Sequence, residues 1–66
     1  MQIQVNGESR QVDEGYTAAR LVEDMALTGR RIAMEINMEI VPRSTYETCV
    51  LNDGDKIEIV HAVGGG

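Results

Sequence analysis

The first twelve residues, MQIQVNGESRQV (1–12), predict a β-hairpin at the beginning of the chain. Apolar and polar side chains alternate in residues 1–5, as they do in a strand that buries one face. Asn6 and Gly7 form the dipeptide that most strongly favours a two-residue hairpin turn, because both residues tolerate a positive φ. Residues 8–12, ESRQV, then supply the returning strand.

One amphipathic helix is predicted after the hairpin. Thr17 is a suitable N-cap residue, because its hydroxyl can accept a hydrogen bond from an unpaired N–H of the first turn. Four apolar residues follow at the spacing of one helical face: Ala18, Leu21, Val22 and Met25. Gly29 is expected to end the helix, since glycine adopts the left-handed conformation there at little cost.

Two further strands are predicted in the middle of the chain. Residues 32–37, IAMEIN, alternate between apolar and polar side chains. A turn at residues 37–39 leads to the short apolar pair at 40–41, which Pro42 ends because proline cannot donate to a strand ladder. These residues predict a second hairpin whose returning strand is short.

The last third of the chain predicts a helical turn, a tight turn and a final strand. Residues 44–47, STYE, match a capping box, which marks the beginning of a helical segment. Residues 51–55, LNDGD, have the composition of a tight turn, and residues 56–63, KIEIVHAV, form the strand. One face of this strand carries the isoleucines, and the other carries Glu58, Val60 and Ala62.

These elements predict an α+β domain, with one helix packed on a mixed sheet of four to five strands. The 66 residues suit a single domain, residues 1–66. Because the chain has no Trp or Phe, we expect a core of Ile, Val, Leu and Met. The net charge of -5 argues against nucleic acid as a partner. The chain shows neither a signal peptide nor a run of membrane-spanning length, so we expect a cytoplasmic protein without membrane partners.

Four features of the sequence are candidates for a chemical site. Cys49, the only cysteine, cannot form an intramolecular disulfide and suits a small buried residue better than a persulfide carrier. His61 has no neighbouring Cys or second His, so no metal site is expected. Residues 53–55 suit a turn better than a calcium loop. Arg43 can pair with an acidic neighbour or with a partner, and the sequence leaves both open. With no catalytic constellation and no cofactor motif, we expect a protein that is not itself an enzyme.

The chain closes with HAVGGG (61–66). Without Cβ atoms, Gly64, Gly65 and Gly66 can lie in a narrow channel, and three extended residues reach roughly 10 Å beyond a folded body. Chain ends are also often frayed, so the glycines alone support either a reactive tail or an inert terminus.

The stretch from residue 37 to residue 66, NMEIVPRSTYETCVLNDGDKIEIVHAVGGG, resembles the ThiS family of sulfur carriers in thiamine (thiazole) biosynthesis. VNGE at residues 5–8 and the helix start at Thr17 are also similar to that family, so the resemblance covers nearly the whole chain. Two features depart from it: the helix TAARLVEDM is poor in Leu, and Tyr46 lies where Trp is frequent. The resemblance implies a ubiquitin-like β-grasp fold.

The resemblance also implies a reaction at the C-terminus. A ThiF-like adenylating enzyme would activate the carboxylate of Gly66, and a sulfur donor protein would convert it to a thiocarboxylate. A ThiG-like thiazole synthase would then take the sulfur. Gly64 and Gly65 would thread the tail into these enzymes, and Val60 and Ala62 would contact the partners. The free carrier is expected to be a monomer.

Three alternatives stay open at this point. A related carrier supplies sulfur for molybdopterin. A ubiquitin-like modifier would be joined through Gly66 to substrate lysines. An inert binding module would not need the tail at all.

Overall fold

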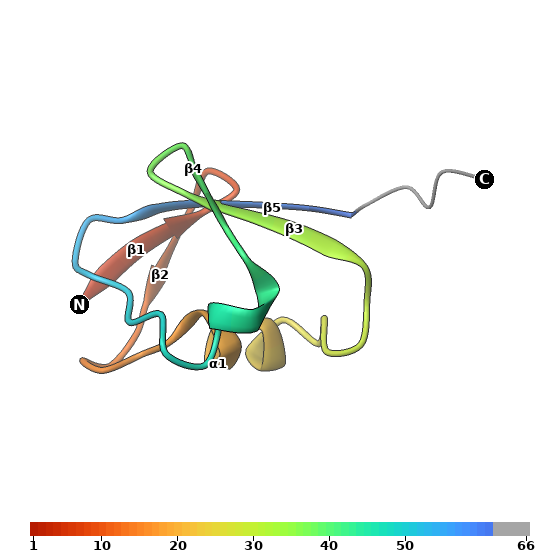
Figure 1. The fold of residues 1–66 in the computed structure, drawn as a ribbon. Helices are drawn as coiled ribbons and strands as arrows, with labels where there is room; N and C mark the ends of the chain where they lie inside the picture. The colour runs from red at the N-terminus through yellow and green to blue at the C-terminus, as the bar shows by residue number, and fades with distance from the viewer. Residues whose placement is uncertain (62–66) are drawn as a thin grey trace.

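The computed structural model describes residues 1–61 of the chain, in which one helix packs against one face of a five-stranded sheet (Figure 1). The strand order is β2-β1-β5-β3-β4, so the last strand lies in the middle. β1 and β5 are parallel and the other neighbours are antiparallel. The elements are β1 (Gln2–Val5), β2 (Glu8–Gln11), α1 (Ala18–Asp24), β3 (Ile32–Ile36), β4 (Glu39–Val41), the 3-10 turn η1 (Arg43–Thr45) and β5 (Lys56–His61).

This arrangement confirms the predicted α+β class and both hairpins. β1 pairs with β2 along its whole length, from Val5↔Glu8 beside the turn to Gln2↔Gln11. Asn6 and Gly7 join the two strands with φ values of 51° and 84°. Two positive φ values in succession give a turn whose twist matches that of the flanking strands, which is why Asn-Gly predicts a hairpin here.

The beginning of α1 agrees with the prediction. Thr17 is the N-cap, and its hydroxyl oxygen accepts a hydrogen bond of 3.2 Å from the Arg20 N–H. The next two N–H groups, of Ala18 and Ala19, donate to the carbonyls of Cys49 and Tyr46 at 2.9 and 3.0 Å. The segment before β5 therefore supplies acceptors that the first turn of a helix lacks within itself.

The predicted end of the helix at Gly29 is wrong. α1 ends at Asp24, and Ala26 takes the left-handed conformation with a φ of 58°. The Ala26 N–H donates to the Glu23 carbonyl at 3.0 Å, and the Leu27 N–H donates to the Val22 carbonyl at 2.9 Å. This pair of bonds is the Schellman motif, here with alanine in place of the usual glycine. The early turn lets Leu27 pack against the core.

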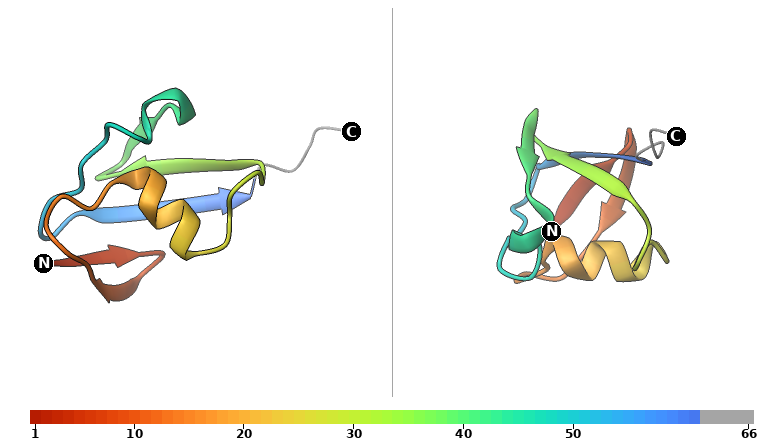
Figure 2. Two further views of the ribbon diagram at one scale, coloured as in Figure 1. Left: turned by 90° about the horizontal axis from the view of Figure 1, so that it is seen from below. Right: turned by 45° about the vertical axis from the view of Figure 1, so that its right-hand side comes forward.

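The core lies between α1 and the inner face of the sheet (Figure 2). Its largest fully buried side chains are aliphatic or Met, as predicted: Ile3, Leu21, Met34, Leu51 and Ile57. The expectation of a core without aromatic residues is wrong in one respect, because Tyr46 is also buried there. Burial raises the pKa of its phenol, since the charged form loses hydration.

The segment between β4 and β5 forms a helical turn, but the predicted capping box is wrong. η1 begins at Arg43, its N-cap is Pro42, and no side chain caps it. The Thr45 hydroxyl instead donates to the Pro42 carbonyl at 2.7 Å. Proline has no side-chain hydrogen-bond acceptor, so a helical turn that begins after Pro42 has no capping side chain at its N-cap position.

Candidate functional site

The described part of the chain ends with β5, the strand that leads to the C-terminal glycines. β5 ends at His61, at the end of the molecule opposite the N-terminus (Figure 1). Ile57 and Ile59 are buried beneath α1, whereas Glu58 and Val60 are exposed on the outer face, as the sequence predicted. The remaining predicted site residues, Ala62, Gly64, Gly65 and Gly66, lie outside the described residues.

Two turn asparagines bind the backbone of β5 from either side. Asn6, in the turn between β1 and β2, accepts a hydrogen bond of 2.8 Å from the Ile59 N–H. Asn37, after β3, accepts one of 3.0 Å from the Lys56 N–H. Both asparagines have a φ of 51°, a conformation that asparagine tolerates better than most residues. Both hairpin turns therefore fix the strand from which the C-terminal segment extends.

The turn before β5 is stabilised by its own carboxylates. Asp55 is buried, and its carboxylate accepts hydrogen bonds from Asn37 Nδ2 at 3.0 Å and from the Asn52 N–H at 2.8 Å. Asp53 Oδ1 accepts from the Gln2 N–H at 2.7 Å. Gly54 has a φ of 86° between them. The predicted tight turn is therefore confirmed, and both of its carboxylates accept hydrogen bonds within the protein.

An apolar and acidic surface covers the outer face of β3, β4 and β5, on the side away from α1. Val60 is 58% exposed, and Ile40 on β4 is 77% exposed. Val60 pairs with Ala33, and Glu35 pairs both with Glu58 on β5 and with Ile40. We call these five residues the outer patch. Within the described residues, neither Glu35 nor Glu58 makes a side-chain hydrogen bond or an ion pair.

The remaining sequence candidates have structural roles or are exposed. Cys49 is half-buried and packs against the core, as predicted for a small apolar residue. His61 is exposed at the end of β5. The Arg43 guanidinium donates to the Arg30 carbonyl. Among residues 1–61, no three His, Cys, Asp or Glu side chains gather closely enough to hold a metal ion.

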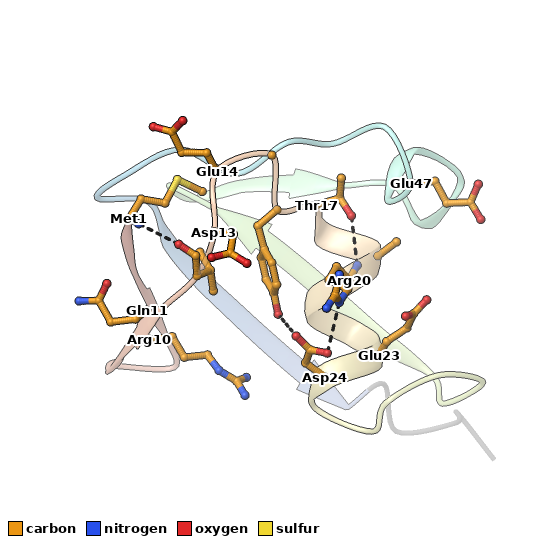
Figure 3. A pocket seen from close by; sticks show the side chains of 14 residues that line it. Met1, Arg10, Gln11, Asp13, Glu14, Thr17, Arg20, Glu23, Asp24 and Glu47 are labelled. Atoms are coloured by element: carbon orange, nitrogen blue, oxygen red, sulfur yellow. Dashed lines mark hydrogen bonds and ion pairs between the residues drawn. The ribbon is translucent and has the colours of Figure 1, made fainter.

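An open hollow of about 870 Å³ lies between α1 and the chain that follows β2 (Figure 3). Inside it, the Tyr16 hydroxyl donates to Asp24 Oδ2 at 2.5 Å, and Arg20 Nε lies 3.5 Å from Asp24 Oδ1. Burial, together with the Asp24 hydrogen bond, raises the pKa of Tyr16 to about 12. The same bond lowers the pKa of Asp24. The polar groups of these three side chains are thus paired with one another. We therefore interpret the hollow as a feature of the surface beside α1 and not as a binding site.

A helix on a mixed five-stranded sheet, with a central last strand leading to the C-terminus, defines the ubiquitin-like β-grasp class. A crystal structure of a thiamine biosynthesis protein (ThiS) from Geobacter metallireducens matches this fold with a TM-score of 0.84 and 28% identity, covering 100% of both chains. The ThiS family model matches residues 3–66. The chain belongs to the ThiS family.

Two relatives describe the family more closely. The sulfur carrier protein ThiS of Escherichia coli is 33% identical over 66 residues, which are 100% of both chains. A thiazole synthase of Paramagnetospirillum magneticum is 42% identical over 66 residues, but this chain spans only 20% of its length. Within residues 1–61, no helix is both long and apolar enough to cross a membrane.

Proposed function

We propose that the chain is a sulfur carrier in thiamine (thiazole) biosynthesis. One observation carries the proposal: the ThiS family match runs from residue 3 through the terminal Gly66, so it includes the glycines that the proposed chemistry requires. The similarity to the sulfur carrier of Escherichia coli over the whole length of both chains supports the same role.

The reacting group in this proposal is the terminal carboxylate of Gly66. A carboxylate is a poor electrophile, because it is anionic and lacks a good leaving group. An adenylating enzyme would join it to the AMP part of ATP and release pyrophosphate. Sulfide (HS⁻) delivered by the sulfur donor protein would then attack the acyl carbon and expel AMP. The new C–S bond replaces the C–O bond to AMP, so the product is the thiocarboxylate itself and no oxidation or reduction is needed. The carrier is a co-substrate in these steps, and its ATP-dependent activation would take place in the cytoplasm.

The position of β5 supports this role. Hydrogen bonds from two turns hold β5 at Lys56 and Ile59, and pairing with β1 fixes its beginning. Pairing with β3 then continues as far as His61. Five residues follow, and an extended chain of that length spans at most roughly 17 Å. Gly64, Gly65 and Gly66 would therefore enter an active site that excludes the folded body, since residues without Cβ atoms pass through a narrow channel.

The proposed acceptor is a ThiG-like thiazole synthase. The thiazole synthase of Paramagnetospirillum magneticum contains a stretch similar to this whole chain within 20% of its own length. A carrier-like segment and a synthase thus occur in one polypeptide in that organism, which favours direct contact between a carrier of this kind and its synthase. A ThiF-like adenylating enzyme and a sulfur donor protein complete the proposed set of partners.

Extending the tail tests the proposed reaction. One glycine added after Gly66 would move the carboxylate about 3.5 Å beyond the reacting position without touching the fold. We expect loss of ATP–pyrophosphate exchange with the cognate adenylating enzyme and an unchanged thermal midpoint. Undiminished exchange by the extended protein would exclude the proposed role of Gly66. Intact mass after sulfur loading should rise by the difference between one sulfur and one oxygen, confined to the C-terminal peptide.

Docking through the outer patch is the second part of the proposal. A few glycines bury little apolar surface and must be ordered on binding, so the body has to contribute contacts. Val60 is the exposed apolar residue of the patch nearest the tail, and Ala62 continues the same strand pattern. Val60→Glu should weaken sulfur transfer to thiazole synthase while preserving the fold. Val50→Glu is the matched control, because Val50 is 53% exposed and lies outside the outer patch.

A further inference from the structure

Three arginines gather at the end of the molecule where β5 finishes. Arg30 and Arg31 precede β3, whose first residue, Ile32, is paired with His61 at the end of β5. Arg43, which follows β4, donates a guanidinium hydrogen bond to the Arg30 carbonyl. We call Arg30, Arg31 and Arg43 the basic corner. The segment that carries Arg30 and Arg31 lies beside the end of β5 in two views (Figures 1 and 2).

The basic corner concentrates charge in an acidic protein. It holds three of the six Lys and Arg residues of a chain whose net charge is -5. All three side chains are exposed. Within residues 1–61 the single ion pair is Arg20–Asp24 on α1, so no described carboxylate forms an ion pair with the corner. Three exposed positive charges on neighbouring segments attract an anionic surface, which offsets their charge when it docks against them.

The two surfaces around the base of the C-terminal segment therefore differ in charge. The outer patch carries Glu35 and Glu58 on the sheet face, whereas the basic corner lies at the beginning of β3 beside the end of β5. A partner that takes in the tail must approach this end of the molecule. Arginine forms planar, bidentate pairs with carboxylates, so a ring of acidic side chains is the surface that fits the corner best.

We propose that the basic corner docks onto an acidic rim around the tail channel of the adenylating enzyme. The inference rests on the proposed function and adds a recognition surface to it. The contact orients the carrier so that the strand leading to Gly66 points into the channel. Charge pairs at the rim of an interface act mainly on the association rate and its salt dependence. The basic corner therefore contributes to capture of the tail, and the chemical step depends on the tail alone.

The test compares ATP–pyrophosphate exchange by variants of the full-length carrier with its cognate adenylating enzyme. Arg31→Gln, Arg43→Gln and the double variant remove charge from the basic corner. Arg10→Gln is the matched control, because it removes the same charge from β2, across the sheet. At low salt we expect the double variant to lose about 3- to 10-fold in kcat/KM, and Arg10→Gln to lose less than about 2-fold. At high salt the double variant and the wild type should converge.

A further variant separates charge from local structure at Arg43. Arg43→Gln also loses the guanidinium hydrogen bond to the Arg30 carbonyl. Arg43→Lys keeps the positive charge and should restore most of the low-salt kcat/KM, with kcat unchanged throughout. Thermal denaturation of each variant checks that the domain stays folded.

Other results would contradict the proposal. If the double variant matches the wild type at low salt, or if Arg10→Gln loses as much, the basic corner has no role in docking. A loss that persists at high salt also overturns the proposal, because it would not be electrostatic. A drop in kcat alone would place the arginines in the chemical step and exclude a rim contact. If the wild type itself supports no exchange, the proposed adenylation fails, and this inference fails with it.

Discussion

Replacing Asn37 by alanine should destabilise the domain strongly, because its side chain makes two hydrogen bonds and its backbone adopts a left-handed conformation. Asn37 Oδ1 accepts from the Lys56 N–H at 3.0 Å, and Asn37 Nδ2 donates to the buried Asp55 carboxylate at 3.0 Å. Its backbone also adopts a φ of 51°, which alanine tolerates poorly. The substitution therefore affects the backbone, the beginning of β5 and a buried charge together.

The three effects can be given rough magnitudes. A hydrogen bond to a charged group contributes about 1.5–3 kcal/mol, and the exposed bond to the Lys56 N–H contributes less, since water can replace it. The left-handed backbone costs alanine about 1 kcal/mol more than asparagine. The sum is about 3 kcal/mol of unfolding free energy. For a domain of this size, each kcal/mol shifts the thermal midpoint by about 4–8 °C, so we expect a decrease of roughly 15 °C.

Thermal denaturation followed by circular dichroism measures this shift, and Asn37→Gly provides the matched comparison. Glycine loses the same two side-chain hydrogen bonds but adopts a positive φ without strain. Asn37→Gly should therefore melt about 4–8 °C above Asn37→Ala. Equal midpoints for the two variants would contradict the backbone argument. A midpoint within about 4 °C of wild type for Asn37→Ala would refute the whole account of how the turn fixes β5.

Two further predictions concern α1 and its surroundings. Ala26→Gly should raise the thermal midpoint by roughly 4–8 °C, because Ala26 has a φ of 58° at the helix C-terminus; Gly29→Ala, at a φ of 79°, should lower it. In an alkaline titration followed by phenolate absorbance, Tyr16 should titrate near its raised pKa of about 12. The stability it contributes is then complete below pH 10.0 and is lost as pH rises through about 12. Tyr16→Phe should abolish this alkaline loss, and a phenol that titrates at its ordinary pKa would contradict the argument.

Local sequence patterns determined most of the elements of this fold. Asn6 and Gly7 predicted the first hairpin, because a two-residue turn needs two positive φ values and these residues supply them. Thr17 predicted the helix start for a similar reason, since a hydroxyl cap acts on a residue three positions away. The alternation in β5 predicted which side chains are buried and placed Val60 on the outer face. Each of these features depends on neighbours within a few residues along the chain.

Tertiary contacts decided the features that depend on distant parts of the chain. The last strand lies between β1 and β3, which no local pattern specifies, and this position brings Asn6 within 2.8 Å of the Ile59 N–H. α1 also ends before Gly29, the end that the local sequence suggested. Its early end goes together with the packing of Leu27 against the core, which the local sequence does not specify.

The candidate site divides in the same way. Gly66 could be proposed as the reacting residue from the sequence, because the proposed chemistry belongs to the terminal carboxylate and the family match extends to residue 66. The basic corner could not, because Arg30 and Arg43 are thirteen residues apart and come together only through the hydrogen bond between them. A side chain whose partner is distant in sequence has no local pattern to mark it, and only the packing of β3 and β4 brings these arginines to the end of β5.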